Sequence, residues 1–284
     1  MLETLPAGHA VAGCRLLRLI GQGAHGVVYL AEPADGGPPL ALKLVQLPTG
    51  ADAGPAHEAF LRTADTARRL SHPGIVALYQ AGIEGSLGWL AMEAVPGADL
   101  GRYTAPARLL PEPLVLRVAE RLALALAYAH GQGVVHRDLK PANVLVHWPS
   151  DSVKLADFGL ARASDAAQTA TGLMLGTPAY MAPEQLAGCV PTPRTDLYAL
   201  GVLLFQLLLG RLPHQAATMG KLLLRVAREP APALRSLRPE LPVALEALVA
   251  ELLQKSPALR PADGMVLAAR LRTLAAAWPA RRGV

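Results

Sequence analysis

An acidic residue, a basic residue and an amide lie close together in the string VVHRDLKPANVLV, residues 134–146. They are Asp138, Lys140 and Asn143, and apolar residues flank them on both sides. Apolar runs around a polar turn predict two short buried strands joined by a charged loop. A carboxylate, an ammonium and an amide on one rigid loop suit the handling of a hydroxyl, a phosphate and a metal ion together. The alternative is a polar turn that does no chemistry.

A cluster of glycines divides two apolar segments within residues 13–30, which predicts a hairpin of strand, glycine-rich turn and strand. The pattern Gly21-x-Gly23-x-x-Gly26-x-Val28 suits a loop that lies over phosphates, because glycines let backbone N–H groups approach closely. The same spacing occurs in Rossmann turns, but those turns open a helix. Here VVYLAEP continues as a strand, which argues against a Rossmann dehydrogenase.

The next apolar segment, ALKLVQL at residues 41–47, predicts a third strand with Ala41 and Lys43 on one face. A lysine in an apolar strand is costly to bury unless it meets an anion. The alternative is an edge lysine that points to solvent. Residues 57–70 then predict a helix that ends before the string SHPG.

Helices are predicted to dominate the remainder of the chain. Residues 114–133 form an amphipathic pattern that ends at a glycine, and residues 197–210 favour a buried helix. Residues 214–277 predict three more helices. Strands are predicted within residues 75–95. Another short strand is predicted from residue 152, and it ends in the tripeptide DFG.

Composition bounds the function classes. A length of 284 residues fits one large domain or two lobes of a single unit, and the 52% hydrophobic content suffices for a core. The net charge is +5, but no dense Lys/Arg run indicates nucleic-acid binding. Cys14 and Cys189 fit no metal site and favour a reducing, cytoplasmic compartment. We see no signal peptide, and no apolar run reaches the ~18 residues that would span a membrane.

The string HRDLKPAN resembles the catalytic loop of eukaryotic-type (Hanks-type) protein kinases in their bacterial style, and Lys140-Pro141 resembles the serine/threonine branch. The glycine pattern, Lys43, DFG and GTPAYMAPE follow in the family's order over about residues 13–275. The resemblance implies an α+β, two-lobed kinase fold. A small β-rich lobe would span about residues 13–95, a larger helical lobe about 96–275, and residues 276–284 would be a short basic tail.

The resemblance implies transfer of the ATP γ-phosphoryl group to Ser or Thr of proteins, with autophosphorylation in a homodimer as a further expectation. Asp138 would accept the hydroxyl proton and Lys140 would steady the γ-phosphate. Asn143 and Asp157 would hold Mg²⁺, with Mn²⁺ as an alternative. The residues expected to bind ATP are Ile20, Gly21, Gln22, Gly23, Ala24, His25, Gly26, Val27, Val28, Ala41, Lys43, Met92, Glu93, Val95, Asp99 and Leu145.

Some of these residues have finer expected roles. Ala41 would pack on the adenine ring, Met92 would be the gatekeeper, and the backbone of Glu93 and Val95 would bond the adenine edge. Asp99 would lie near the ribose hydroxyls. As a bare pattern, Met92 is a core methionine.

Three threonines have expected roles in regulation and substrate binding. Thr169 and Thr171 are the candidates for regulatory phosphorylation, since Arg137 could pair with an added phosphate. The alternative is a loop that is never phosphorylated. Thr177 would bond Asp138 and Lys140, which favours Ser/Thr over Tyr substrates.

Two structural roles also follow from the resemblance. Glu184 would form an ion pair with Arg260. Asp196 would bind the backbone of the catalytic loop.

The sequence departs from the family at one position. Kinases pair the strand lysine with a Glu nine residues before the HP dipeptide, and here that position is Thr63. Glu58 and Asp65 lie about 140° and 160° from the required helix face. Either the helix shifts so that one of them reaches Lys43, or the ion pair is missing, or the alignment contains a gap. This departure motivates the alternative of a pseudokinase that binds nucleotide as a scaffold. A small-molecule phosphotransferase is less favoured, because GTPAYMAPE resembles a peptide platform.

Overall fold

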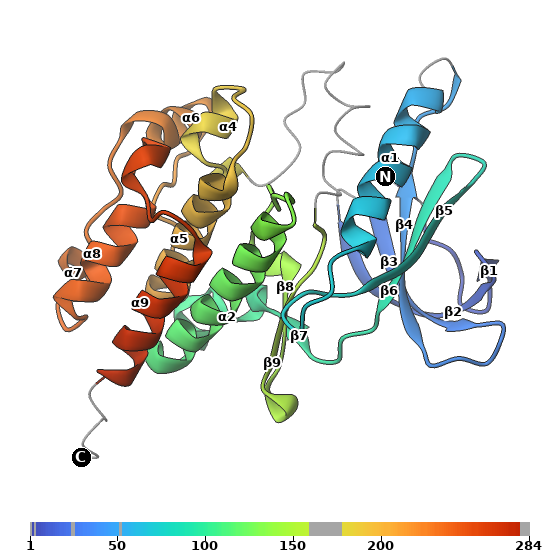
Figure 1. Ribbon diagram of the computed structural model, residues 1–284, viewed down its shortest axis with the longest axis horizontal. Coiled ribbons are helices and arrows are strands. Elements are labelled where there is room, and N and C mark those ends of the chain that lie inside the picture. The colour runs from blue at the N-terminus through green and yellow to red at the C-terminus, as the bar shows by residue number, and fades with distance from the viewer. Residues whose placement is uncertain (1, 3, 24–25, 51–52, 159–177, 279–284) are drawn as a thin grey trace. The chain divides into compact units, whose positions relative to one another are not determined.

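The computed structural model describes residues 2, 4–23, 26–50, 53–158 and 178–278 (Figure 1). The chain divides into two compact units. The β-rich unit holds the described residues up to Pro96, together with Asp157 and Phe158. The helical unit holds Gly97–Ala156 and the described residues from Pro178 onward.

A six-stranded antiparallel sheet, in the order β1-β2-β3-β4-β6-β5, forms the β-rich unit. Its strands are β1 (Ala10–Val11), β2 (Cys14–Gly23), β3 (Gly26–Pro33), β4 (Leu40–Gln46), β5 (Leu78–Glu84) and β6 (Leu87–Glu93). The predicted hairpin is β2–β3, and the predicted third strand is β4. β1 was not predicted, because two residues are too few to show alternation.

Side chains of the sheet pack into two clusters. One cluster contains Leu16, Tyr29 and Leu42, and the other joins the sheet to α1 (Ala53–Arg68) through Phe60. Figure 1 shows α1 lying along β4 and β5. The helix begins four residues before its predicted start at residue 57. Pro55 lies in its first turn, where a missing N–H costs nothing.

Gly26 begins β3 in a conformation that only glycine adopts easily. Its φ is 124°, and a β-carbon there would collide with the carbonyl oxygen of Leu44 on β4. We therefore expect Gly26→Ala to lower the free energy of unfolding by about 3 kcal/mol, measured by urea denaturation. Gly23→Ala is the control, since a β-carbon there would meet nothing within 4 Å. Equal stability of the two variants would contradict the expectation.

The helical unit contains a three-stranded sheet, in the order β7-β8-β9, and a set of packed helices. Its strands are β7 (Ala98–Asp99), β8 (Val144–His147) and β9 (Ser152–Leu155). Its α-helices are α2 (Glu112–Gly131), α4 (Pro183–Leu186), α5 (Pro193–Leu209), α6 (Met219–Arg228), α7 (Leu234–Leu237), α8 (Val243–Leu252) and α9 (Gly264–Ala276). Its 3₁₀ turns are η2 (Leu100–Tyr103), η3 (Pro106–Arg108), η4 (Pro141–Asn143), η5 (Trp148–Ser150), η7 (Pro178–Tyr180) and η8 (Pro257–Leu259).

The predicted buried helix is α5, most of whose side chains are buried. It packs against α2 and α8, and α9 lies along α2 (Figure 1). Gly201 allows close packing with α8, since a β-carbon there would lie 2.7 Å from Cβ of Leu252. The three helices predicted between residues 214 and 277 are α6, α8 and α9. The single turn α7 lies in the proline-rich segment EPAPALRSLRPELP, residues 229–242, between α6 and α8.

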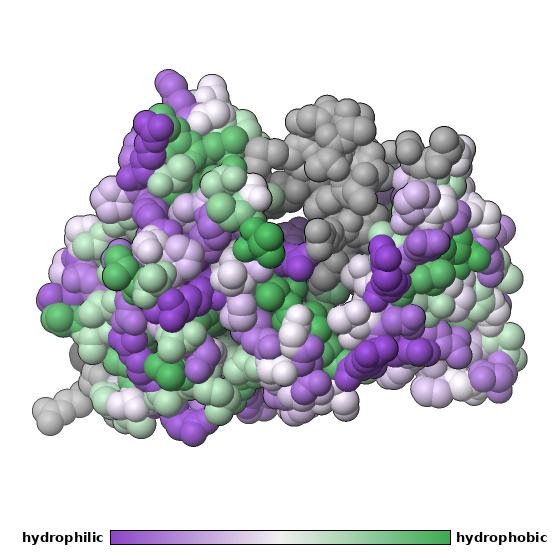
Figure 2. Space-filling model, turned by 45° about the horizontal axis from the view of Figure 1, so that its top comes forward, coloured by the Kyte–Doolittle hydropathy of each residue, from purple (hydrophilic) through white to green (hydrophobic). Residues whose placement is uncertain are grey.

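Hydrophilic and hydrophobic residues are interspersed on the face drawn in Figure 2. Cys14 is buried and Cys189 is exposed, and both are free thiols. Among the helices of the described residues, none is long and apolar enough to cross a lipid bilayer.

Candidate active site

The three residues of the polar loop contact one another in the helical unit. Lys140 Nζ lies 2.7 Å from Asp138 Oδ2, and Asn143 Nδ2 donates to the same oxygen at 3.1 Å. Asn143 Nδ2 also donates to the Asp138 carbonyl at 2.7 Å. The Asp138 side chain remains 18% exposed. The carboxylate is thus oriented by two neighbours and still open to a reactant.

Asp196 on α5 fixes the backbone that precedes Asp138. Its carboxylate accepts the N–H of His136 and that of Arg137, each at 2.8 Å, which confirms its predicted role. His130 on α2 contacts the same carboxylate through Nε2 at 2.8 Å. The Asp196 side chain is only 1% exposed. Three donors around one buried carboxylate hold the loop in place.

Further contacts around the loop were not predicted. His136, which is fully buried, accepts the Asp138 N–H at Nδ1 (3.2 Å), and its Nε2 lies 2.8 Å from the Ala156 carbonyl. Its place inside HRDLKPAN was the available sequence signal. Gln185 donates to the Arg137 carbonyl at 3.0 Å. Neither that contact nor the one between His130 and Asp196 has a sequence signal, because the two partners of each contact lie far apart in the chain.

Arg137 adopts φ 72°, in the left-handed region that is costly for a non-glycine residue. Asp196 accepts the Arg137 N–H, and Gln185 donates to the Arg137 carbonyl. These two hydrogen bonds hold the residue in this conformation. Backbone strain of this kind concentrates at functional sites.

Lys43 on β4 forms its ion pair with Asp157, at 2.7 Å between Nζ and Oδ2. Both residues belong to the β-rich unit. The Lys43 side chain is only 7% exposed, so this lysine is not an edge residue that points to solvent. Asp157 also has a left-handed φ, 65°.

The helix α1 supplies no carboxylate to Lys43 among the described residues. Glu58 and Asp65 are both exposed, and Asp65 pairs with Arg68 at 3.4 Å instead. Thr63 donates its hydroxyl to the carbonyl of Ala59, one turn earlier, at 2.8 Å. Of the three explanations offered by the sequence, the structure therefore favours a missing ion pair between helix and strand.

Phe158 follows Asp157 and is 4% exposed. It lines a cavity of about 20 Å³ with Leu70, Ile75 and Met92, which fixes the chain just after Asp157. Met92 pairs in register with Ala41, so the two residues expected at the adenine are neighbours.

The turn between β2 and β3 carries the glycine pattern. Gln22 pairs with Val27, and Gly23 pairs with Gly26. Val27 as a whole residue is 1% exposed and packs in the core. Ile20 is 43% exposed. Ala24 and His25 lie outside the described residues, as do Thr169, Thr171 and Thr177.

The remaining residues expected at ATP fall into two groups. In the β-rich unit, the Glu93 N–H donates to the Ala77 carbonyl at 2.8 Å. The backbone of Val95 makes no hydrogen bond within the described part of the chain. In the helical unit, Asp99 on β7 pairs in register with Leu145 on β8, and its carboxylate accepts the Gly101 N–H at 2.8 Å.

Asn143 in the helical unit and Asp157 in the β-rich unit each carry oxygen atoms of the kind that magnesium binds. The Asn143 amide nitrogen is committed to Asp138, which leaves its carbonyl oxygen as an acceptor. Asp157 offers carboxylate oxygens, and Mg²⁺ prefers oxygen ligands from one or two side chains and from substrate phosphates. No cluster of three or more His, Cys, Asp or Glu residues among the described ones could hold a metal ion.

Glu184 and Arg260 form the predicted ion pair, at 2.6 and 2.8 Å. The Arg260 side chain is 0% exposed and also donates to the carbonyls of Arg194, Gln254 and Lys255. Burial acts most strongly and would raise the pKa of the Glu184 carboxyl, but the hydrogen bonds and charge of Arg260, together with a backbone hydrogen bond and one from Thr195, lower it overall.

Known proteins resemble this chain over most of its length. The protein kinase domain family matches residues 14–271. The chain is 41% identical over 268 residues to the serine/threonine-protein kinase PknJ of Mycobacterium tuberculosis, which covers 92% of this chain and 45% of that protein. It is 35% identical over 245 residues to the serine/threonine-protein kinase PrkC of Bacillus subtilis, which covers 86% of this chain and 37% of that protein.

A solved structure agrees with these relatives. The crystal structure of Rad53 residues 1–466 in complex with AMP-PNP matches with a TM-score of 0.75 and 25% identity. The match covers 90% of this chain and 64% of that chain. The chain spans less than half the length of the two bacterial relatives.

Proposed function

This chain belongs to the protein kinase family, and on that premise we propose that it transfers the γ-phosphoryl group of ATP to serine and threonine hydroxyls of proteins. The observation that supports this best is the Asp138 carboxylate, oriented by Lys140 and Asn143 on a backbone that Asp196 fixes. A rigid carboxylate beside an ammonium suits a reaction in which positioning and electrostatics do most of the catalysis.

In the proposed reaction Asp138 orients the substrate hydroxyl and accepts its proton. The hydroxyl oxygen forms a bond to the γ-phosphorus while the bond from that phosphorus to the β–γ bridging oxygen breaks and ADP leaves. Lys140 steadies the γ-phosphoryl oxygens as their charge redistributes. The Lys140 ammonium lies 2.7 Å from Asp138, so Lys140 can contact both the carboxylate and the γ-phosphoryl group.

The β-rich unit supplies the proposed contacts to ATP. Lys43 is a buried ammonium within an ion pair, available to the α- and β-phosphates when they arrive. A β-carbon at Gly23 would meet no described atom within 4 Å, and this open space supports a close approach of phosphates to its backbone. Ala41 and Met92 border the adenine in this proposal, and Val95 offers an unbonded backbone to its edge.

Asn143 and Asp157 would hold Mg²⁺, or Mn²⁺ as an alternative. A metal held by these two side chains would supply positive charge that offsets the charge of the phosphates.

The proposal is tested with the purified chain, Mg²⁺, labelled ATP and a generic protein substrate. We expect label on the chain or on the substrate, recovered as phosphoserine or phosphothreonine. A pseudokinase would bind ATP and transfer nothing, so a nucleotide-binding measurement beside the transfer assay separates the two functions. Absence of transfer by a folded, ATP-binding protein would overturn the proposal.

Lys43→Met is expected to lower kcat/KM for ATP by about 10- to 150-fold, the value of a charged hydrogen bond lost in a buried site. Thr63→Ala is expected to change it less than twofold, since the Thr63 hydroxyl bonds only its own helix. Steady-state kinetics at varied ATP measures both. Lys221→Met, on an exposed lysine of α6, controls for loss of charge. A large effect of Thr63→Ala would show that α1 contributes to catalysis.

Several finer roles belong to the same proposal. Thr169 and Thr171 would accept phosphate in autophosphorylation between two copies of the chain, and Arg137 would bind the added phosphate. Thr177 would bond Asp138 and favour Ser/Thr substrates. A reducing, cytoplasmic compartment fits the two free thiols.

A further inference from the structure

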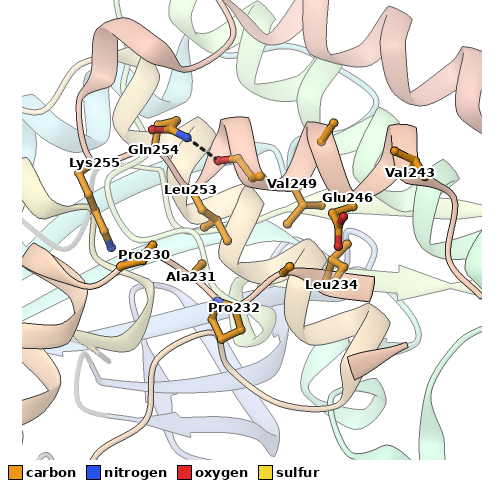
Figure 3. Close-up of a pocket in the computed structure, with 13 residues that line it drawn as sticks. Pro230, Ala231, Pro232, Leu234, Val243, Glu246, Val249, Leu253, Gln254 and Lys255 are labelled. Atoms are coloured by element: carbon orange, nitrogen blue, oxygen red, sulfur yellow. Dashed lines mark hydrogen bonds between the residues drawn. The ribbon is translucent and has the colours of Figure 1, made fainter. Parts of the chain in front are cut away.

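A pocket in the helical unit has no part in the proposed reaction. It lies between α8 and the segment that joins α6 to α7, and its volume is about 390 Å³ (Figure 3). Its floor consists of the buried side chains Leu234, Val249 and Leu253, and Pro230 and Pro232 stand at its rim. A mostly apolar cavity of this size with few polar groups is typical of small-molecule sites.

The two ends of the pocket carry opposite charges. Lys255 lies at one end, and Figure 3 shows its amine directed toward Pro230. Glu246 lies toward the other end, beside Leu234, and its carboxylate accepts the backbone N–H of Arg235 at 2.6 Å. The pocket therefore has a polarity that a ligand with one charged end can match.

Lys255 forms no ion pair within the described ranges, although the charge of Glu229 acts on it from nearby. Its amine donates to the Val226 carbonyl at 2.7 Å and lies 3.3 Å from His214 Nε2, and it pairs with no carboxylate among the described residues. Arg260 and Lys255 both lie near the Tyr198 ring, at 4.8 and 6.0 Å from its centroid. Arg260 forms an ion pair with Glu184, whereas the half-buried ammonium of Lys255 forms none in the part of the chain that the structure describes.

Burial and the nearby positive charges lower the pKa values of two groups at this end of the pocket. Burial, and then the nearby Arg260, lower the pKa of Lys255 to about 8. Burial, and then Lys255 itself, lower the pKa of His214 to about 4. A partly buried charge without a partner is costly, so an anion placed here would gain an interaction that the protein leaves unfilled.

We propose that this pocket binds an amphipathic anion, a medium-length aliphatic carboxylate whose head group meets Lys255. Its chain would lie on Val249 and Leu253, directed away from the head group along the apolar floor. The carboxylate of Glu246 would repel an anion at the far end and so fix the direction of the ligand. The inference is independent of phosphoryl transfer, because it concerns binding in a different part of the helical unit.

The test is calorimetric titration of the full chain with decanoate, kept below its critical micelle concentration and without ATP. We expect saturable binding of one decanoate per chain. Lys255→Gln should weaken it by about 10- to 150-fold, the range for a lost charged hydrogen bond. Ala250→Phe, at an exposed position that lines the pocket, should fill the space and abolish binding. Lys221→Gln, on an exposed lysine of α6, should bind as the wild type does.

A second probe separates charge from hydrophobicity. Decyltrimethylammonium has the same chain and the opposite charge, and we expect it to bind at least about tenfold more weakly than decanoate. Equal binding of the two probes, unsaturable binding, or no binding of decanoate would overturn the proposal. So would unchanged affinity in both Lys255→Gln and Ala250→Phe, once thermal unfolding shows that the variants are folded.

The pH dependence identifies the titrating group. From pH 6 to 9 His214 stays neutral, and the other charged groups that act on Lys255 or His214 are Arg225, Glu229 and Arg260. Burial raises the pKa of Tyr198, so its hydroxyl also stays protonated. Decanoate affinity should therefore be constant below pH 8 and fall above it, as Lys255 loses its proton. Lys255→Arg should remove the fall, because arginine stays charged; a fall that persists in this variant would contradict the assignment.

Discussion

Replacement of Asp138 by asparagine is expected to lower kcat for protein phosphorylation by about 10²- to 10⁴-fold, the usual contribution of a positioned general base. The amide can still accept a hydrogen bond but cannot take the proton from the substrate hydroxyl. Steady-state assays with saturating ATP and Mg²⁺ measure the loss. Nucleotide affinity, measured separately, should stay within a few-fold of the wild type, because Asp138 is not among the residues expected to bind ATP.

The control for this variant is Asp35→Asn. Asp35 lies in the exposed turn between β3 and β4, where its side chain accepts the Gly37 N–H at 3.1 Å. Wild-type activity is expected there. Equal transfer by Asp138→Asn and the wild type would remove Asp138 from the mechanism and return the pseudokinase alternative to first place.

Replacement of Arg260 by methionine should cost about 3–5 kcal/mol of stability, because it leaves a partly buried carboxylate without its partner. The guanidinium is fully buried and also satisfies three backbone carbonyls. Urea denaturation measures the free energy of unfolding of the wild type and the variant.

A surface ion pair provides the matched control. Arg270 pairs with Glu251 at 2.7 Å, but their side chains are 40% and 32% exposed. Arg270→Met should cost less than about 1 kcal/mol, since solvent screens the pair. A similar cost for the two variants would show that burial of the Arg260 pair contributes little to stability.

The sequence predicted two kinds of feature in the site. The first kind lies within a short sequence motif, and the second is an ion pair that the resemblance to kinases implies. The catalytic loop and the glycine hairpin are of the first kind, and the Glu184–Arg260 pair is of the second. Long apolar patterns also predicted α5 and β4 well, because their burial leaves a clear periodic signal.

Other features depend on contacts between distant segments, which no local pattern records. The spacing of acidic residues on α1 left the ion-pair partner of Lys43 unidentified. Only the fold shows that Lys43 pairs with Asp157. The contact of His130 with Asp196 joins α2 to α5 across 66 residues of chain. The surroundings of the Lys255 amine are likewise visible only once its neighbours from α6 and the region around Arg260 are in place.

The pairing of Lys43 with Asp157 makes two binding events share one carboxylate. In the proposed function Asp157 turns to a divalent cation while Lys43 turns to phosphates, so each event releases the group that the other needs. By thermodynamic linkage, if the metal raises the affinity for the nucleotide by some factor, the nucleotide raises the affinity for the metal by the same factor. In a kinase with no carboxylate on α1 to take Lys43, nucleotide and metal are therefore expected to bind cooperatively.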